Sequence, residues 1–383
     1  MYIEIGDSIG RFLKAKKTSD VLKKQIESIL LLSVISIQHG HHCVNTQSEE
    51  CALSIYRNSE NNQTKQIFCH IYQNYSTYLA GLKNQLQNYI RIENTTKDIE
   101  RVKISDEKYV TIVSLDVANR LPFWESVCFL PENIRDYRFF LRIANYKKEP
   151  KYDKIKFSLR REQGQGSRAI DTYICRCSEK NFIFALLDND ISKPGEAIRP
   201  NSTAYKFLNS VYKDSPYGFF HILNVHELEN LFSSKSFISK VDHHVASQIE
   251  ESQKIDPNVT LYYDMKNGIT YSLLMKNEYM KQFINRPISP CSSHIDGKKC
   301  PNGKCNRTFL NGLGGQYLER LFGDDPDFKE SVTDIESKTK KEFSKQFKSA
   351  PNELAEPIKK EWSAIYTFFL TYFCSYSFMI SGA

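Results

Sequence analysis

The sequence predicts an α/β fold built on a doubly wound parallel sheet, flanked by a mainly helical N-terminal region and a helical C-terminal region. Within residues 121–235, apolar runs of strand length alternate with segments of helical spacing. The runs VCFL and FIFALL are apolar at every position, as expected for parallel strands that are buried on both faces. A domain usually has roughly 100–200 residues, so a chain of 383 residues is expected to form more than one.

We therefore divide the chain into residues 1–120, 121–235 and 236–383. The first region contains VLKKQIESILLLSVISI, which has the length and apolar density of a core-facing helix. The last ends in AIYTFFLTYFCSYSFMI, which we interpret as a buried helix because Thr and Ser interrupt it. For the middle region the pattern predicts strands at 123–130, 154–159, 181–187 and 218–225, and helices at 134–146, 166–178 and 201–213.

Composition limits the classes of function only weakly. The net charge of +7 and the pI near 8.7 permit a polyanionic partner without requiring one. The N-terminal segment lacks the apolar core of a signal peptide, and no run reaches the length of a membrane span, so we expect a cytoplasmic protein with no membrane partner. In that compartment the ten cysteines are expected to be reduced thiols or metal ligands.

Acidic residues follow two of the predicted strands. Glu132 closes the run VCFLPE, and Asp188 and Asp190 close FIFALLDND. One strand-helix unit separates them, so a parallel sheet would bring the three carboxylates to the same edge. Because converging carboxylates repel one another unless a divalent cation lies among them, this pattern predicts a Mg²⁺ or Mn²⁺ site.

Four segments match one family's motifs in order and spacing. They are FLPENIRDYRFF with Glu132, Asp136, Phe139 and Phe140; GQGSRAIDTYICRC with Gly164, Gly166 and Ser167; LLDND with Asp188 and Asp190; and FFHILNVHELENLF with Glu227, Glu229 and Asn230. Together they resemble the TOPRIM domain of nucleases of the overcoming-lysogenization-defect type and of the TOPRIM effector of PARIS anti-phage defence. The family usually has Val and Gly where this chain has Pro131 and Asn133.

The resemblance implies a Mg²⁺-dependent nuclease that cleaves DNA or RNA as a prokaryotic antiviral defence effector, with homo-oligomerisation open. It implies Glu132 as general acid/base or as a ligand of a second metal ion, with Glu227 or Glu229 completing a two-metal site. Because the chain has no G-x-x-x-x-G-K-[ST] phosphate loop, we expect a separate ATPase partner.

Alternatives to this reading remain open. The chain could be a non-catalytic nucleic-acid-binding or regulatory subunit on a degenerate TOPRIM fold, which Pro131 and Asn133 favour. It could also be a phosphotransferase or primase-like enzyme. Glu227 and Glu229 could instead be loop carboxylates that cap a turn or pair with Lys235.

The C-terminal region contains a second cluster, PCSSHIDGKKCPNGKC, among Gly, Pro and Lys residues. Cys291, His294, Cys300 and Cys305 have the soft ligand types of a small zinc knuckle, on turns that need no hydrophobic core. The spacing C-x2-H-x5-C-x4-C is close to known knuckles without matching the common pattern. A Zn²⁺ ion at these four residues and a metal-free loop with reduced thiols are both open.

Overall fold

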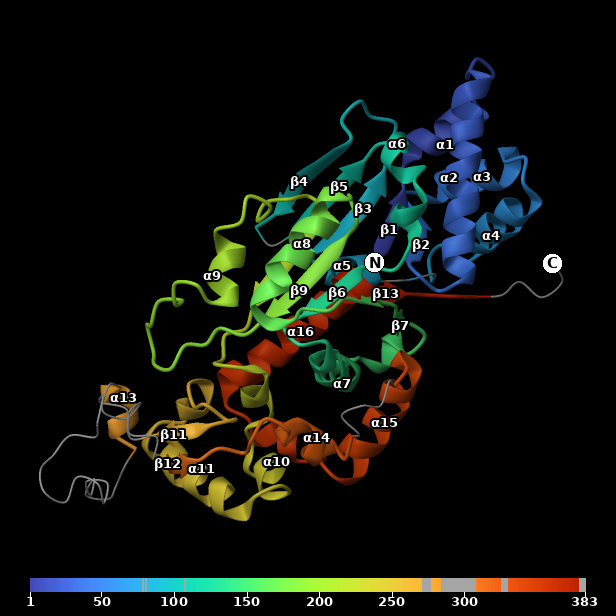
Figure 1. Ribbon diagram of the computed structural model, residues 1–383. Helices are drawn as coiled ribbons and strands as arrows, with labels where there is room; N and C mark the ends of the chain where they lie inside the picture. Colours follow the sequence, from blue (N-terminus) through green and yellow to red (C-terminus); the bar gives the residue numbers. More distant parts are fainter. Residues whose placement is uncertain are drawn as a thin grey trace, which may run out of the picture.

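The protein has a mixed α/β fold with two separate, mainly parallel sheets (Figure 1). The computed structural model describes residues 1–77, 79, 81–106, 108–270, 277–283, 308–324 and 330–378. The first sheet lies within residues 1–120 and the second within residues 121–235. Helices of the C-terminal region form a layer below the second sheet in Figure 1.

The first sheet was not predicted from the sequence. Its strand order is β2-β1-β3-β5-β4, and all neighbours are parallel except β4 and β5. Strands β1 and β2 have four residues each and lie beside longer helices, so helical periodicity dominates their surroundings. Strands β3, β4 and β5 follow one another without a helix and were missed. The elements are β1 (Tyr2–Ile5), α1 (Asp7–Lys14), α2 (Asp20–Gln38), β2 (Cys43–Thr46), α3 (Glu49–Asn58), α4 (Asn62–Gln73), α5 (Leu82–Gln85), β3 (Asn88–Ile92), β4 (Ile99–Ser105), β5 (Lys108–Val113) and α6 (Leu115–Ala118).

The second sheet is entirely parallel and has the order β10-β9-β6-β8. The strands predicted at 181–187 and 218–225 and the three predicted helices are confirmed within a few residues, although the last helix is shorter than expected. The elements are β6 (Cys128–Pro131), α7 (Tyr137–Lys147), β8 (Arg160–Arg161), α8 (Ala169–Ser178), β9 (Ile183–Leu187), α9 (Thr203–Leu208) and β10 (Gly218–Ile222).

Two of the predicted strands differ from the structure. The segment predicted at 123–130 begins as a 3₁₀ helix, Leu121–Trp124, in which Pro122 lies at the start, and only β6 is extended. The strand predicted at 154–159 is wrong as a member of this sheet. Within it, β7 (Lys156–Phe157) instead pairs antiparallel with β13 (Cys374–Ser375), more than 200 residues away in the sequence.

Helices cover both faces of the second sheet, so it is doubly wound as predicted. On one face, Phe129 and Phe184 contact Phe373 of α16 (Glu356–Phe373), with ring centroids 5.2 and 6.0 Å apart. On the other face, Leu130 and Ala185 pack in a second core with residues of α8 and α9. Alternation along each strand sends successive side chains to opposite faces, which explains the uninterrupted apolar runs.

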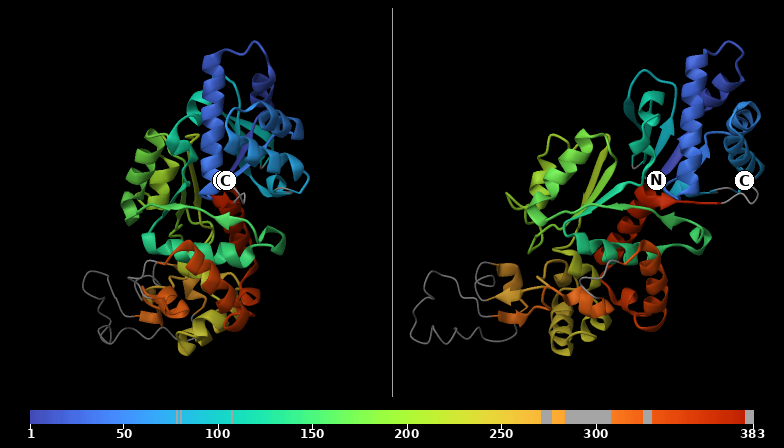
Figure 2. Two further views of the ribbon diagram at one scale, coloured as in Figure 1. Left: turned by 90° about the vertical axis from the view of Figure 1, so that its right-hand side faces the viewer. Right: turned by 45° about the vertical axis from the view of Figure 1, so that its right-hand side comes forward.

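The C-terminal segment predicted as a buried helix, residues 364–380, is confirmed only up to Phe373, where α16 ends, and ten residues of α16 are buried. The chain then continues as β13. Two views show this helix running beneath both sheets (Figures 1 and 2). In the described residues no helix is both long and apolar enough to cross a membrane. The other C-terminal elements are α10 (Lys235–Ser239), α11 (His243–Ile255), β11 (Gly268–Thr270), α13 (Glu278–Lys281), β12 (Thr308–Asn311), α14 (Tyr317–Phe322) and α15 (Val332–Lys345).

A buried ionic network joins α7 to the C-terminal layer. The Arg142 guanidinium contacts Asp324 at 2.8 Å and Glu342 at 3.1 Å, and Arg138 contacts Glu319 at 3.4 Å. Both arginines are almost fully buried. A guanidinium remains charged under all ordinary conditions, so its burial requires these paired carboxylates. The C-terminal layer is therefore held against the helix that follows β6.

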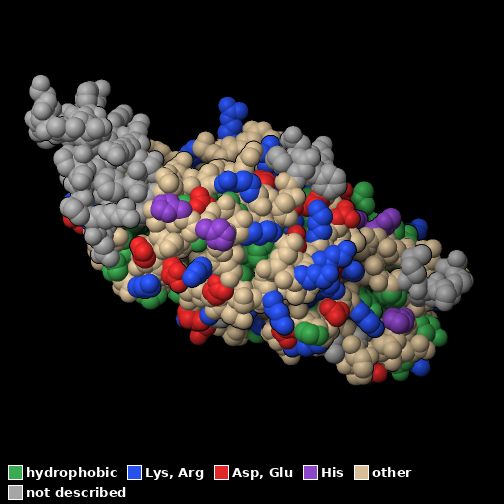
Figure 3. All heavy atoms as spheres, turned by 90° about the horizontal axis from the view of Figure 1, so that it is seen from below, with side chains coloured by type: hydrophobic (Ala, Val, Ile, Leu, Met, Phe, Trp, Pro, Cys, Tyr) green, Lys and Arg blue, Asp and Glu red, His purple; other side chains and the backbone are tan. Residues whose placement is uncertain are grey.

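Acidic and basic side chains are interspersed over the described part of the lower face (Figure 3). A nucleic-acid-binding surface usually concentrates positive charge in a patch or stripe. The even mixture agrees with the modest net charge of +7. Charge on this face therefore provides no argument for a polyanionic partner.

Candidate functional site

The predicted carboxylates lie at one edge of the second sheet. Strands β6, β9 and β10 are adjacent and parallel, and their ends are level, since Pro131 is opposite Leu186 and Leu187 is opposite Ile222. Glu132 follows β6 directly, and Asp188 follows β9 directly. The sheet therefore brings together residues that are 56 positions apart in the sequence.

Hydrogen bonds fix the carboxylates of Glu132 and Asp188. Glu132 Oε2 accepts a hydrogen bond from the Asp188 backbone N–H at 3.3 Å, and Glu132 Oε1 accepts one from the Thr203 hydroxyl at 2.9 Å. Asp188 Oδ1 accepts a hydrogen bond from the Leu228 backbone N–H at 3.0 Å. All three donors lie at the ends of neighbouring elements, so both side chains are held by the sheet edge itself.

The glycine-rich turn supports the backbone of Glu132. A Cβ atom at Gly164 would lie 2.1 Å from the carbonyl oxygen of Pro131, so only glycine fits this close approach. Gly166, at φ +57°, donates its N–H to the Glu132 carbonyl at 3.0 Å. The turn that was singled out from the sequence therefore packs against the strand end that carries the candidate catalytic residue.

Glu227 and Glu229 lie in the loop and 3₁₀ helix that follow β10, and both are buried. Lys266 Nζ lies 3.1 Å from a carboxylate oxygen of each. The alternative in which they pair with Lys235 is wrong, because Lys235 pairs with Glu250 at 2.8 Å. The hydrogen bond between Glu227 N–H and Asn230 Oδ1, at 3.0 Å, shows that this glutamate also begins the helix, as the capping alternative proposed.

Asp190 is placed differently from Asp188. Its backbone has φ +57°, in the left-handed region, and its N–H donates to the His226 carbonyl at 2.9 Å. This turn directs the chain away from the sheet edge after β9. Asp188, Glu132 and Glu229 line a cleft of about 440 Å³, and Asp190 lies beside that cleft without lining it.

The cleft is lined by five carboxyl side chains, most of them partly buried. Its lining includes two basic side chains, and the residues are Glu132, Asn133, Ile134, Arg135, Asp136, Phe139, Gln163, Gln165, Gly166, Asp188, Glu229, Lys266, Gly315, Leu318 and Glu319. Burial raises the pKa of Asp136 to about 7 and the pKa of Glu229 to about 8. Burial and the neighbouring Glu132 raise the pKa of Asp188 well above its usual range.

Burial and neighbouring charges also shift the pKa values of Glu132 and Lys266. Burial raises the pKa of Glu132, and Asp190 adds to this effect against the hydrogen bond from Thr203. Burial alone would lower the pKa of Lys266, but Glu229, Glu227 and Asp188 outweigh it and raise that pKa. The raised pKa values show that these carboxyls resist ionisation without a counter-charge. A divalent cation among them would favour the ionised form.

Two residues of this site were not assigned a role from the sequence. Lys266 lies 134 positions after Glu132, in a turn without periodicity, so no local signal marks it. Asp136 was noted only as part of a motif. The structure places its carboxylate in the cleft, where Asp136 Oδ2 also accepts the Asn133 N–H at 3.1 Å. Asn133, which stands where the family has Gly, therefore serves a capping interaction.

The predicted zinc ligands, Cys291, His294, Cys300 and Cys305, lie outside the described residues, and a zinc site there stays a prediction. Comparisons with family models, with curated proteins and with solved structures found no match to this chain. The site's chemistry therefore has to be argued from its own geometry.

The raised pKa of Glu229 predicts a pH-dependent effect of Glu229→Gln on stability. Folded Glu229 keeps its proton up to about pH 8, whereas the unfolded side chain ionises near pH 4, so the stability it contributes is lost as pH rises through about 8. Relative to wild type, Glu229→Gln should gain on the order of 2 kcal/mol between pH 6 and pH 9. Denaturant unfolding in EDTA at both pH values tests this, and a pH-independent difference would contradict it.

Proposed function

We propose that this chain is a divalent-metal-dependent nuclease with a TOPRIM-like catalytic domain. The observation that carries the proposal is the meeting of Glu132, Asp188 and Glu229 in one cleft at the carboxyl ends of three adjacent parallel strands. In open α/β sheets this edge is where ligands bind. The arrangement matches the motif order on which the resemblance rests.

The carboxylates fit a Mg²⁺ or Mn²⁺ ion. Glu132 and Asp188 offer hard oxygen ligands, and Asp136 lines the same cleft. Each ligand oxygen already held by one hydrogen bond keeps a further lone pair for a cation. A bound ion would polarise a phosphodiester and stabilise charge on the leaving oxygen.

The chain's own residues would then divide the remaining tasks. Glu132 would serve either as a ligand of the ion or as the general acid or base, and the direction of its pKa shift, upward through burial, favours the second role. Lys266 holds a positive charge at the cleft wall between Glu227 and Glu229 and would stabilise a phosphate oxygen electrostatically. In this arrangement one metal ion and one fixed ammonium take the place of a two-metal pair.

The same Lys266 geometry also supports the alternative function, a non-catalytic nucleic-acid-binding or regulatory subunit. In that case, the ammonium group neutralises glutamates that no longer hold a metal ion. Pro131 at the strand end and Asn133 in its capping interaction are the other observations in its favour. A role in antiviral defence belongs to the proposal through the resemblance alone. The separate ATPase partner rests on the resemblance and on the lack of a phosphate-loop motif in this sequence, and cytoplasmic location on the sequence pattern.

Thermal melting of Asp188→Asn and wild type, in EDTA and with Mg²⁺, tests the site. The amide keeps the oxygen that accepts the Leu228 N–H but cannot ionise, so it removes one partly buried carboxyl group from the cleft. We expect an unchanged or raised melting temperature in EDTA, because mutual repulsion is relieved, together with loss of the stabilisation by Mg²⁺ that wild type should show. Melting well below wild type in EDTA would instead make Asp188 a structural residue.

Cleavage is tested on duplex DNA, single-stranded DNA and tRNA, with Mg²⁺, with Mn²⁺ and with EDTA. Wild type is expected to cut at least one substrate only when a divalent ion is present, and Asp188→Asn none. Cleavage that persists in EDTA, or that Asp188→Asn retains in full, would contradict the proposed mechanism.

A further inference from the structure

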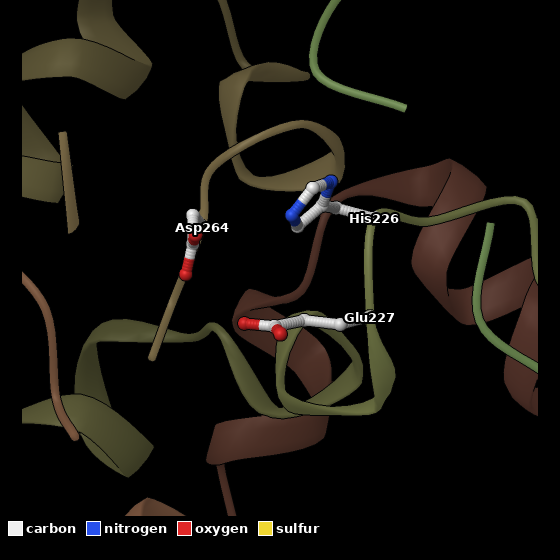
Figure 4. A group of neighbouring side chains, drawn as sticks. All are labelled: His226, Glu227 and Asp264. Atoms are coloured by element: carbon white, nitrogen blue, oxygen red, sulfur yellow. The ribbon is translucent and has the colours of Figure 1, made fainter. Parts of the chain in front are cut away.

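A second group of metal-ligand side chains lies beside the cleft. His226, Glu227 and Asp264 each offer one ligand atom, and these three atoms lie within 4.8 Å of one another. His226 and Glu227 follow β10, whereas Asp264 precedes β11. Figure 4 shows the three side chains pointing into a common space from these two loops. The His226 backbone N–H donates a hydrogen bond to the Leu261 carbonyl oxygen at 2.7 Å. This bond joins the two loops beside the three ligand side chains.

The orientation of His226 leaves a nitrogen lone pair directed into this space. His226 Nδ1 lies 2.8 Å from the Ile191 carbonyl oxygen, which can only accept, so Nδ1 carries the proton. The lone pair of a neutral ring is then on Nε2, which no described residue engages in a hydrogen bond. His226 is only 8% exposed. A histidine held in this way by a backbone carbonyl is the usual form of a metal-ligating imidazole.

The two carboxylates are oriented in a comparable manner. Glu227 Oε1 accepts the Lys266 backbone N–H at 3.0 Å, and Asp264 Oδ1 accepts the Asn267 N–H at 2.7 Å. An ionised carboxylate has about four acceptor positions, so each group keeps capacity for a cation. The ligand set is therefore one nitrogen and two oxygens. Side chains also contact the second oxygen of each carboxylate, since Glu227 Oε2 pairs with Lys266 Nζ at 3.1 Å and Asp264 Oδ2 accepts a hydrogen bond from Asn267 Nδ2 at 3.1 Å.

We propose that His226, Glu227 and Asp264 bind one divalent first-row transition-metal ion, with Mn²⁺ or Zn²⁺ preferred over Mg²⁺. An imidazole ligand suits transition metals, whereas Mg²⁺ prefers oxygen ligands alone. Three protein ligands leave positions open for water. The site adjoins the cleft, because Lys266 pairs with both Glu227 and the cleft residue Glu229. Its three ligands are other residues than Glu132 and Asp188, and the proposal does not depend on the proposed nuclease activity.

Pulsed electron paramagnetic resonance of bound Mn²⁺ tests the proposal, because a histidine ligand adds a ¹⁴N modulation that carboxylates do not. Full-length protein is freed of metal with a chelator and loaded with about two equivalents of Mn²⁺. We expect the ¹⁴N modulation in wild type and in His243→Ala, a control at an exposed histidine of α11, and its loss in His226→Ala.

Two further variants separate failure of this metal-site proposal from failure of the nuclease proposal. Asp264→Asn, a conservative change, should keep the fold and weaken Mn²⁺ binding at this site at least tenfold. Asp188→Asn should keep the ¹⁴N modulation while losing the cleft ion, so failure of the nuclease proposal would leave this result unchanged. A wild-type spectrum without ¹⁴N modulation, or one whose modulation survives His226→Ala, would overturn the assignment.

Discussion

Replacement of Glu132 by Gln is expected to lower divalent-dependent cleavage by about 10²–10⁴, the usual effect of losing a positioned proton-transfer group. Nucleic-acid binding should stay within a few-fold of wild type, because Gln keeps the shape of the side chain and the acceptor for the Thr203 hydroxyl. In cells, the same change should remove any toxicity or phage protection that the intact gene confers. Cleavage rates and binding constants measured on the same preparations test the two expectations together.

Glu196→Gln is a matched control for this variant. Glu196 is also a partly buried glutamate that accepts a backbone hydrogen bond, from Ser192 at 2.6 Å, but it does not line the cleft. The Glu196→Gln variant should cleave nucleic acid at the wild-type rate. Full biological activity of Glu132→Gln would mean that the chain works by binding, and the regulatory alternative would then be preferred.

Replacement of Lys266 by Met is expected to have the largest effect on stability. Removing one partner of a buried ion pair usually costs roughly 3–5 kcal/mol, since the other charge is left buried and unpaired. The Lys266 side chain is 35% exposed, so solvent screening reduces the expected loss to about 2 kcal/mol at pH 9. At pH 6 the loss should be smaller, because Glu229, whose pKa is about 8, is then protonated. Denaturant unfolding at both pH values measures this difference.

Lys235→Met provides the comparison. Lys235 also pairs with a glutamate, Glu250, but both side chains are largely exposed. Exposed pairs contribute roughly 0–1 kcal/mol, with little dependence on pH in this range. If Lys266→Met were no more destabilising than Lys235→Met at pH 9, the burial of Glu227 and Glu229 would not depend on the Lys266 ammonium group.

The second sheet could be predicted because its buried strands are visible in the sequence as uninterrupted apolar runs. VCFL and FIFALL contact helices on both faces, and each ends in an acidic residue that the parallel register brings to one edge. The meeting of Glu132 and Asp188 follows from these local signals and from the general rule for open α/β sheets.

The rest depended on contacts that leave no local pattern. Lys266 reaches Glu227 and Glu229 from a turn more than thirty positions later, and nothing in its neighbours distinguishes it from a surface lysine. The role of β7 is set by β13, near the other end of the described chain. In the first sheet, Tyr2–Ile5 and Cys43–Thr46 are too short to outweigh the helices beside them. Length does not explain the missed strands Ile99–Ser105 and Lys108–Val113, which are longer than those of the second sheet.

The central claim is that the cleft at the sheet edge holds a divalent cation on Glu132 and Asp188. Anomalous diffraction from crystals soaked in Mn²⁺ tests it most directly, because occupancy of the site does not require an activating partner or the correct substrate. The account predicts an anomalous peak within ligand distance of both carboxylates in wild type and no peak at that position in Asp188→Asn. A fully ordered cleft without Mn²⁺, in crystals that carry the ion elsewhere, would contradict it.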